Sequence, residues 1–215
     1  MLPVLLKLKL AMSAASGLAA AAGPVAMPGN AIATVIVERA AAPVEVKLYD
    51  ENLRIGATIG IRRDGAMDDA TAAEVKHLFR CRQTNRERPI ARRTLAMLAD
   101  VADRYDRTIE FVSAYRVQHG ESSTSPHRGA RAIDFRIRGV SLPEIRDYLW
   151  RTYTEVGIGW YPVEQFIHMD SRPTLHDTAW TFLAGENHYH PYWAEVARRP
   201  VSEATARPPR HRPGV

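Results

Sequence analysis

Two short segments of the sequence carry side chains that could bind one metal ion. His127 precedes an alternating apolar and polar run, and Asp134 stands seven residues later on the polar face of that run. His168 and Asp170 share one face of a second run, residues 166–170, because alternate residues of a strand point to the same side. Imidazole nitrogens and carboxylate oxygens are zinc ligands, and three such ligands with a fourth position left to water form a catalytic site. We therefore select His127, Asp134 and His168 as candidate zinc ligands.

Other reactive side chains stand in weaker patterns. His188 and His190 have the alternate spacing with which two strand residues reach one metal ion, but Pro191 follows them and aromatic residues surround them. This composition indicates aromatic packing or the wall of a substrate cleft, so the pair stays outside the predicted ligand set. Cys81 is the single cysteine, which excludes an intrachain disulfide and a thiolate-rich metal site. A catalytic thiol helped by His77, one helical turn upstream, is the alternative to simple packing of Cys81 in the core.

Alternating and β-branched runs predict the strands that must hold these side chains. They cover residues 34–38, 44–49, 53–61, 109–113, 132–137, 156–161 and 165–170. A short turn joins the last two runs, which predicts a hairpin. His168 would then lie on the second strand of the hairpin, and Asp134 on the strand that precedes it.

Three segments between the strands predict helices. Residues 69–79 contain strong helix formers after an aspartate suited to the N-cap, and residues 91–105 repeat apolar side chains at helical spacing. Ser141, with Glu144 three residues later, forms a capping box that opens a helix through about Tyr153. Together these elements predict an α+β fold in which helices cover one side of a small antiparallel sheet. The metal site would lie on the open face of that sheet.

The N-terminal segment differs in composition from the rest of the chain. Lys7 and Lys9 precede an apolar run at residues 10–22, and the small residues Ala31-Ile32-Ala33 match a signal-peptide cleavage site. We interpret residues 1–33 as a secretory signal. A disordered or anchored N-terminus is the alternative.

The rest of the chain is long enough to form one hydrophobic core. Residues 34–197 are predicted to form a single domain, and the basic, proline-rich residues 198–215 a disordered tail. No later stretch reaches the ~18 to 20 apolar residues of a membrane-spanning helix. We expect the protein to be a monomer. The net charge of +5 comes without a helix-turn-helix, zinc-finger or aromatic RNA-binding signature, so no nucleic-acid partner is expected. A nucleic-acid surface is the weakest alternative and would use Arg80, Arg82, Arg86, Arg88, Arg92 and Arg93.

Five ordered motifs link the candidate ligands to a known group of proteins. They are Ser113-Ala114-Tyr115-Arg116, Ser125-x-His127, Ala132-x-Asp134, Gly157-Ile158-Gly159-x-Tyr161-Pro162 and Phe166-Ile167-His168-Met169-Asp170. In this order they resemble the D-Ala-D-Ala peptidase and hedgehog-like metallopeptidase superfamily, and within it the murein endopeptidase branch. The likeness extends from about residue 48 to residue 180.

The resemblance implies a cofactor, a reaction and a location. His127, Asp134 and His168 would bind Zn²⁺, and Arg116 would lie beside the substrate, where a guanidinium can hold a carboxylate or a developing oxyanion. The implied reaction is attack by zinc-activated water on a peptide bond of peptidoglycan, in stem peptides or crosslinks, while a protein carboxylate moves the proton. The implied enzyme is a murein endopeptidase or a D,D- or L,D-carboxypeptidase. Such a protein would be exported to the periplasm or another part of the bacterial cell envelope.

Two positions depart from the pattern of that superfamily. Ala130 stands where a glycine usually follows the first histidine by three residues, so a turn that needs positive φ would have to be rebuilt around Gly129. Gln165 occupies the place of an acidic base, three residues before the last histidine, and an amide cannot usefully accept a proton.

The proton carrier must therefore stand elsewhere. We expect Asp170 in this role, and orientation of His168 is its equally supported alternative. Glu164, in the adjoining turn, is the second candidate. The missing acid also leaves a second function open: a metal-containing peptidoglycan-binding module of the same fold without catalysis.

Overall fold

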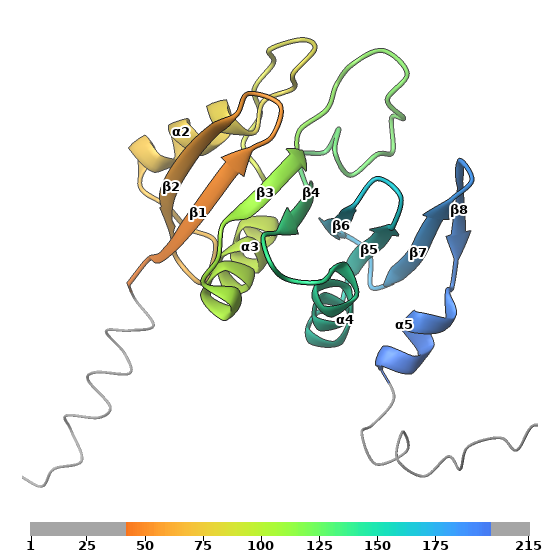
Figure 1. Ribbon diagram of the computed structural model, residues 1–215. Helices are drawn as coiled ribbons and strands as arrows, with labels where there is room; N and C mark the ends of the chain where they lie inside the picture. Colours follow the sequence, from red (N-terminus) through yellow and green to blue (C-terminus); the bar gives the residue numbers. More distant parts are fainter. Residues whose placement is uncertain (1–41, 199–215) are drawn as a thin grey trace, which may run out of the picture. The chain divides into compact units, whose positions relative to one another are not determined.

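The computed structural model of the protein describes residues 42–198 (Figure 1). The predicted signal at residues 1–33, the predicted strand at residues 34–38 and nearly all of the predicted tail lie outside these residues. None of the helices between residues 42 and 198 combines the length and the apolar character that crossing a membrane requires.

Eight strands form one sheet in the described part of the chain, in the order β2-β1-β3-β4-β6-β5-β7-β8. The six strand runs predicted between residues 44 and 170 coincide with β1 to β6 to within two residues at their ends. The bounds are Val44–Asp50 (β1), Ile55–Ile61 (β2), Ile109–Ser113 (β3), Ala132–Ile137 (β4), Val156–Tyr161 (β5), Phe166–Ser171 (β6), Thr178–Leu183 (β7) and Glu186–Tyr189 (β8).

The sheet is mixed, and the expectation of a small antiparallel sheet was wrong in this respect. β1 pairs in parallel with β3, and β5 pairs in parallel with β7. Both parallel pairs join strands that do not follow each other directly, so the chain between them has room to cross over. Alternation shows which residues share a face of a strand, but it does not identify the neighbouring strand or its direction. The α+β class is confirmed.

The helices of the described residues are α2 (Asp69–Leu78), α3 (Arg92–Tyr105), α4 (Leu142–Thr152) and α5 (Tyr192–Ala197). The first three begin within one residue of the predicted starts, whereas α5 was not predicted from the sequence. The Asp68 carboxylate accepts a hydrogen bond from the Thr71 backbone N–H, and the Ser141 hydroxyl accepts one from the Glu144 backbone N–H at 3.3 Å. Each bond satisfies one of the free N–H groups in the first turn of its helix.

α3 covers one face of the sheet (Figure 1). Its Thr94 hydroxyl lies 2.8 Å from the Ser171 hydroxyl of β6, so Ser171 points toward the helix. His168 and Asp170 stand at odd spacings from Ser171 along the same strand and therefore point to the other face. α4 packs beside α3, where the Tyr148 hydroxyl donates to the Asp100 carboxylate. The helices thus leave the ligand face of β6 free.

A further hairpin, β7–β8, was not predicted from the sequence. Ala184 and Gly185 connect the two strands with positive φ angles of 52° and 86°. This is the two-residue turn whose twist matches that of the flanking strands, and its usual sequence signal is Asn-Gly or Asp-Gly. Alanine is uncommon at the first position, so the turn was not recognised. The hairpin places an additional pair of strands beside β5.

Candidate metal centre

One row of residues crosses six strands on the open face of the sheet. Each member lies opposite the next in the strand register, and residues that pair in this way point to the same face. In strand order the row is Ser113, Asp134, His168, Gly159, Trp180 and Tyr189. The register therefore puts Asp134 and His168 side by side, although 34 residues separate them in the chain.

The three candidate ligands converge. His168 Nδ1 lies 2.8 Å from Asp134 Oδ1 and 3.1 Å from His127 Nε2, and His127 Nε2 lies 3.2 Å from Asp134 Oδ2. All three side chains are buried. One ligand atom of each side chain lies within 4.8 Å of the others, which is close enough to hold a metal ion. No other such group of three is found among the described residues.

The outer nitrogens of the two imidazoles have acceptors of their own. His127 Nδ1 lies 2.6 Å from the Ala114 carbonyl, and His168 Nε2 lies 3.1 Å from Asp170 Oδ2. When a metal is bound, these partners would keep the ring protons on the outer nitrogens and leave His127 Nε2 and His168 Nδ1 as the ligand atoms. Metal-binding histidines are held by carboxylates and backbone carbonyls in the same way, so the residues present fit a zinc ion.

The negative charges of the buried carboxylates favour binding of a cation at the cluster. Burial alone would raise the pKa of Asp134, but the charges and hydrogen bonds of His127 and His168 outweigh it and hold that pKa below its usual range. Burial would lower the pKa of His168, yet its hydrogen bonds to Asp134 and Asp170 raise it to about 9. The metal-free cluster thus retains a proton between carboxylates, in the region where a metal cation would bind.

Two glycines of β5 make room for the side chains around His168. A Cβ atom at Gly157 would lie 2.0 Å from Asp170 Oδ2, and a Cβ atom at Gly159 would lie 2.4 Å from the Trp180 ring. Both distances are far inside van der Waals contact. The Gly157-Ile158-Gly159 motif therefore permits Asp170 to reach His168 and the Trp180 ring to lie 5.0 Å from the His168 ring.

The turn after His127 keeps its shape without glycine. Ala130 itself adopts a positive φ of 52°, and its backbone N–H donates to the His127 carbonyl at 3.0 Å. The expectation that the turn would be rebuilt around Gly129 was therefore wrong. The left-handed conformation costs an alanine ~1 to 2 kcal/mol. The Ala130 carbonyl accepts a hydrogen bond from the Ala91 backbone N–H, which ties the turn to the start of α3.

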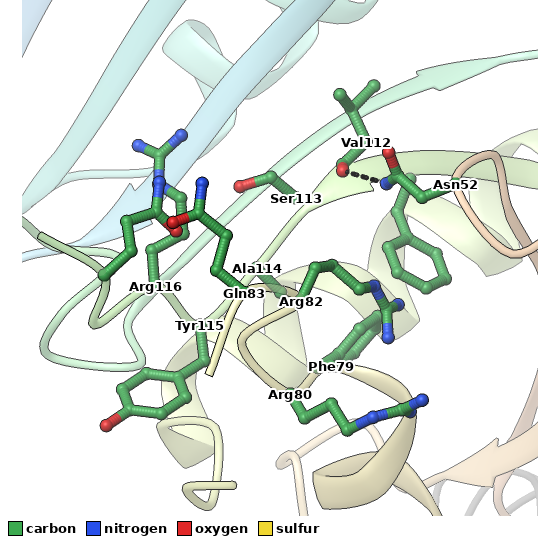
Figure 2. A pocket seen from close by; sticks show the side chains of 12 residues that line it. Asn52, Phe79, Arg80, Arg82, Gln83, Val112, Ser113, Ala114, Tyr115 and Arg116 are labelled. Atoms are coloured by element: carbon green, nitrogen blue, oxygen red, sulfur yellow. Dashed lines mark hydrogen bonds between the residues drawn. The ribbon is translucent and has the colours of Figure 1, made fainter. Parts of the chain in front are cut away.

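Arg116 stands at the rim of the cluster. Its Nη1 lies 3.7 Å from Asp134 Oδ2, and its Nε lies 3.1 Å from Glu121 Oε2. Arg116 also lines a neighbouring hollow of about 180 Å³, in which Figure 2 shows it together with Arg80 and Arg82. Arg116 therefore lines two adjoining spaces on the surface.

The two predicted proton carriers lie in different surroundings. Asp170 is fully buried, with Oδ1 3.2 Å from Arg172 Nε and Oδ2 3.1 Å from His168 Nε2. Burial opposes ionisation of Asp170, but its contacts with His168 and Arg172 keep its pKa below the usual range. Glu164 is exposed in the turn before β6, and neither carboxylate lines the space above the cluster. Gln165, also exposed, bonds through its amide to the Pro162 carbonyl.

A cleft of about 400 Å³ opens over the cluster, a volume suited to a small ligand or a peptide segment. Glu121 and Asp134 are the carboxylates in its lining. Glu121 was missed in the sequence because it stands in an irregular stretch with no periodic pattern. The cleft also has an aromatic wall, which consists of Tyr161, Phe166, Trp180 and Tyr189. Of the aromatic residues near His188 and His190, Trp180 and Tyr189 thus line the cleft, whereas Phe182, Tyr192 and Trp193 do not.

The remaining candidates lie apart from the cleft. His188 and His190 are exposed, and neither lines the cleft. Cys81 is buried with its sulfur 3.8 Å from Gln118 Oε1, while His77 is turned to Glu87 at 2.7 Å, so this histidine is not placed to activate the thiol. Within the basic run, Arg82, Arg92 and Arg93 form ion pairs with acidic side chains.

Comparison with known proteins places most of the site in one family. A family model described as peptidoglycan L,D-endopeptidase MepK matches residues 38–176. The probable peptidoglycan L,D-endopeptidase MepK of Haemophilus influenzae is 38% identical over 58 residues, which are 27% of this chain and 31% of that protein. Peptidoglycan L,D-endopeptidase MepK of Escherichia coli K12 is 29% identical over 80 residues, 33% of this chain and 43% of that protein. The chain thus spans less than half of the length of these relatives, and no solved structure matches it.

The match with the family model ends before β7. Ser113, Asp134, His168 and Gly159 of the row lie inside it, whereas Trp180 and Tyr189 lie outside it. The metal cluster therefore belongs to the shared part of the chain, and the β7–β8 side of the aromatic wall does not.

Proposed function

Because the chain belongs to the family described as peptidoglycan L,D-endopeptidase MepK, we propose that it is a zinc-dependent hydrolase of peptide bonds in peptidoglycan. This membership agrees with the superfamily that the sequence motifs indicated. One observation carries the proposal: two imidazoles and a carboxylate place ligand atoms within 4.8 Å of one another beside an open cleft. The names of the relatives make a peptide bond between an L and a D stereocentre the first substrate to test.

In this proposal, three residues bind the metal and two support them. His127 would bind through Nε2, His168 through Nδ1 and Asp134 through its carboxylate. The Ala114 carbonyl and the Asp170 carboxylate hold the imidazole rings in the required tautomers. When bound, a zinc ion would supply a Lewis acid that polarises a peptide carbonyl and lowers the pKa of a water molecule.

Substrate is held by the walls of the cleft. The Arg116 guanidinium, one third exposed, can donate to a substrate carboxylate or to the carbonyl oxygen as negative charge develops on it. The aromatic wall offers flat apolar surfaces, with the Tyr161 hydroxyl 3.2 Å from Trp180 Nε1 as a polar group among them. Such a wall excludes water from one side of the peptide.

A hydrolysis assay tests the function directly. The purified, zinc-loaded protein is incubated with peptidoglycan peptides that contain an L,D bond, a D,D bond or only L residues, with and without a chelator. We expect chelator-sensitive cleavage of the L,D bond within the peptide, and chromatography with mass spectrometry identifies the products. Release of terminal D-Ala alone would instead indicate a carboxypeptidase.

A non-catalytic binding module is the second candidate. It is favoured by Gln165 at the position of the usual acid and by the full burial of Asp170. Retention of the peptides by the zinc-loaded protein without cleavage of any of them would support this alternative. Calorimetric titration with the same peptides measures it.

Export and assembly complete the proposal. Residues 1–33 would direct the chain to the periplasm, where residues 34–197 act as one domain, and the protein would be monomeric. N-terminal sequencing of protein recovered from the cell envelope tests cleavage after Ala33. Light scattering of the purified protein gives the mass of the particle.

A further inference from the structure

Hydrolysis of a peptide bond needs a group that moves a proton, and Glu121 is the carboxylate best placed for it. Of the two carboxylates that line the cleft, Asp134 faces both histidines of the metal cluster. Asp170 is enclosed by His168 and Arg172, and Glu164 is exposed outside the cleft lining. Glu121 is therefore the cleft carboxylate that does not belong to the cluster.

A tight turn brings Glu121 to the cleft. The Glu121 backbone N–H donates to the Gln118 carbonyl at 3.2 Å, and Gly120 between them has a positive φ of 85°. Glycine adopts this conformation without the strain that a side chain would add. As a result, the Glu121 side chain is 11% exposed, although its neighbours in the segment between β3 and β4 lie at the surface.

The Arg116 side chain lies between Glu121 and the candidate metal ligands. Its planar guanidinium has Nε 3.1 Å from Glu121 Oε2 and Nη1 3.7 Å from Asp134 Oδ2, so one rigid group faces both carboxylates. Arg116 Nε is buried without an aligned hydrogen bond, so it meets Glu121 as an ion pair alone. The two carboxylates thus approach one side of the cleft.

We propose that Glu121 is the proton carrier of the reaction, an inference that rests on the proposed function. The attacking water gives one proton to a Glu121 oxygen as the water oxygen bonds to the carbonyl carbon. The carbon–nitrogen bond then breaks, and Glu121 returns the proton to the leaving nitrogen. A carboxylic acid and an amine are released, and Glu121 is again ionised.

The main test is Glu121→Gln in the full, zinc-loaded protein. We expect kcat on the L,D peptide to fall ~10²- to 10⁴-fold, the range for loss of a general base. The zinc dissociation constant should stay within ~3-fold of the unaltered value, because a change below ~0.7 kcal/mol is expected for a group that does not bind the metal. Glu121→Asp should recover part of the rate. Glu164→Gln, an exposed carboxylate changed in the same way, should leave kcat and zinc binding unchanged.

A second measurement does not depend on turnover. Cobalt(II) in place of zinc gives a visible absorption band that follows ionisation of water at the metal, and a neighbouring carboxylate shifts the midpoint of that titration. We expect Glu121→Gln to move the midpoint by at least ~0.5 pH unit, or ~0.7 kcal/mol, and Glu164→Gln to leave it in place.

Three results would overturn the assignment. Unaltered kcat in Glu121→Gln would exclude proton transfer by this residue. A raised KM with normal kcat would make Glu121 a substrate-binding group. If the unaltered protein cleaves none of the peptides, the proposed function fails on its own, and an unshifted cobalt titration in Glu121→Gln would then also reject any influence of Glu121 on the metal site.

Discussion

Two buried aspartates, Asp50 and Asp134, differ in the groups that surround their carboxylates. Asp50 accepts hydrogen bonds from the backbone N–H groups of Asn52 and Leu53 at 2.9 and 3.1 Å and forms an ion pair with Arg82. Its partners are permanent donors supplied by the chain. Asp134 instead faces His127 and His168, whose nearest nitrogens carry lone pairs unless a proton or a metal is present.

This difference separates a structural carboxylate from a functional one at equal burial. A buried charge must be matched by donors or by an opposite charge, and the Asp50 charge is matched by the folded chain alone. The Arg116 guanidinium approaches Asp134 only to 3.7 Å, and the nearest partners of Asp134 match its charge only when a proton or a metal ion joins the site. We therefore expect changes at Asp50 to affect stability and changes around Asp134 to affect metal binding.

The largest effect is expected from Asp134→Ala. Loss of one of three ligands should weaken zinc binding more than ~10³-fold, or ~4 kcal/mol, and abolish hydrolysis. His127→Ala and His168→Ala should behave alike. The metal-free variant should still fold and unfold cooperatively. Metal analysis after dialysis gives the zinc content, and full occupancy in all three variants would place the ligands elsewhere, with His188 and His190 as the next candidates.

Asp50→Ala should have the next largest effect, on folding. It leaves the Arg82 charge and two N–H groups without their acceptor, and removal of one partner of a buried ion pair typically costs ~3 to 5 kcal/mol. Chemical denaturation measures the loss, and the fraction that remains folded should still bind zinc. Glu45→Ala is the control on the same strand, because its pairing with Lys47 at 3.8 Å is exposed and contributes little. Equal losses in the two variants would contradict the comparison.

The pH dependence of the metal-free protein should show the role of the proton at His168. The folded pKa of about 9 lies above the ordinary histidine pKa of 6.5, so the stabilisation is complete below about pH 6.5 and is lost as the pH rises through about 9. The full shift corresponds to up to ~3 kcal/mol. Urea denaturation at several pH values measures it, with His168→Ala as the control that lacks this slope. Stability that rises between pH 6.5 and 9 because of His168 would contradict the assignment.

The smallest effect is expected from Asp170→Asn. The amide keeps the size of the side chain but weakens the hold on His168 Nε2, and loss of such a supporting partner typically costs ~10- to 100-fold in metal affinity or activity. Competition with a coloured chelator measures the zinc affinity. Unchanged affinity together with lost turnover would instead identify Asp170 as the proton carrier and would contradict the assignment of Glu121.

Much of the fold followed from local patterns. The six strands β1 to β6 and the helices α2, α3 and α4 were predicted because period, capping side chains and turn residues act within a few residues along the chain. The β7–β8 hairpin and α5 were missed. The hairpin depends on an alanine that takes a left-handed conformation, which is set by the pairing of the two strands and not by alanine's own preference.

For the site, the sequence by itself determined the types of the three ligands and the strand faces on which Asp134 and His168 lie, because side-chain chemistry and two-residue alternation are local properties. Tertiary structure alone decided that β4 and β6 are neighbours in the register that pairs Asp134 with His168. It also decided that Ala130 keeps the turn after His127 and that Glu121 reaches the cleft. The physical reason is that strand order, register and loop position depend on the packing of residues far apart in the chain, and that information is not carried by any single segment.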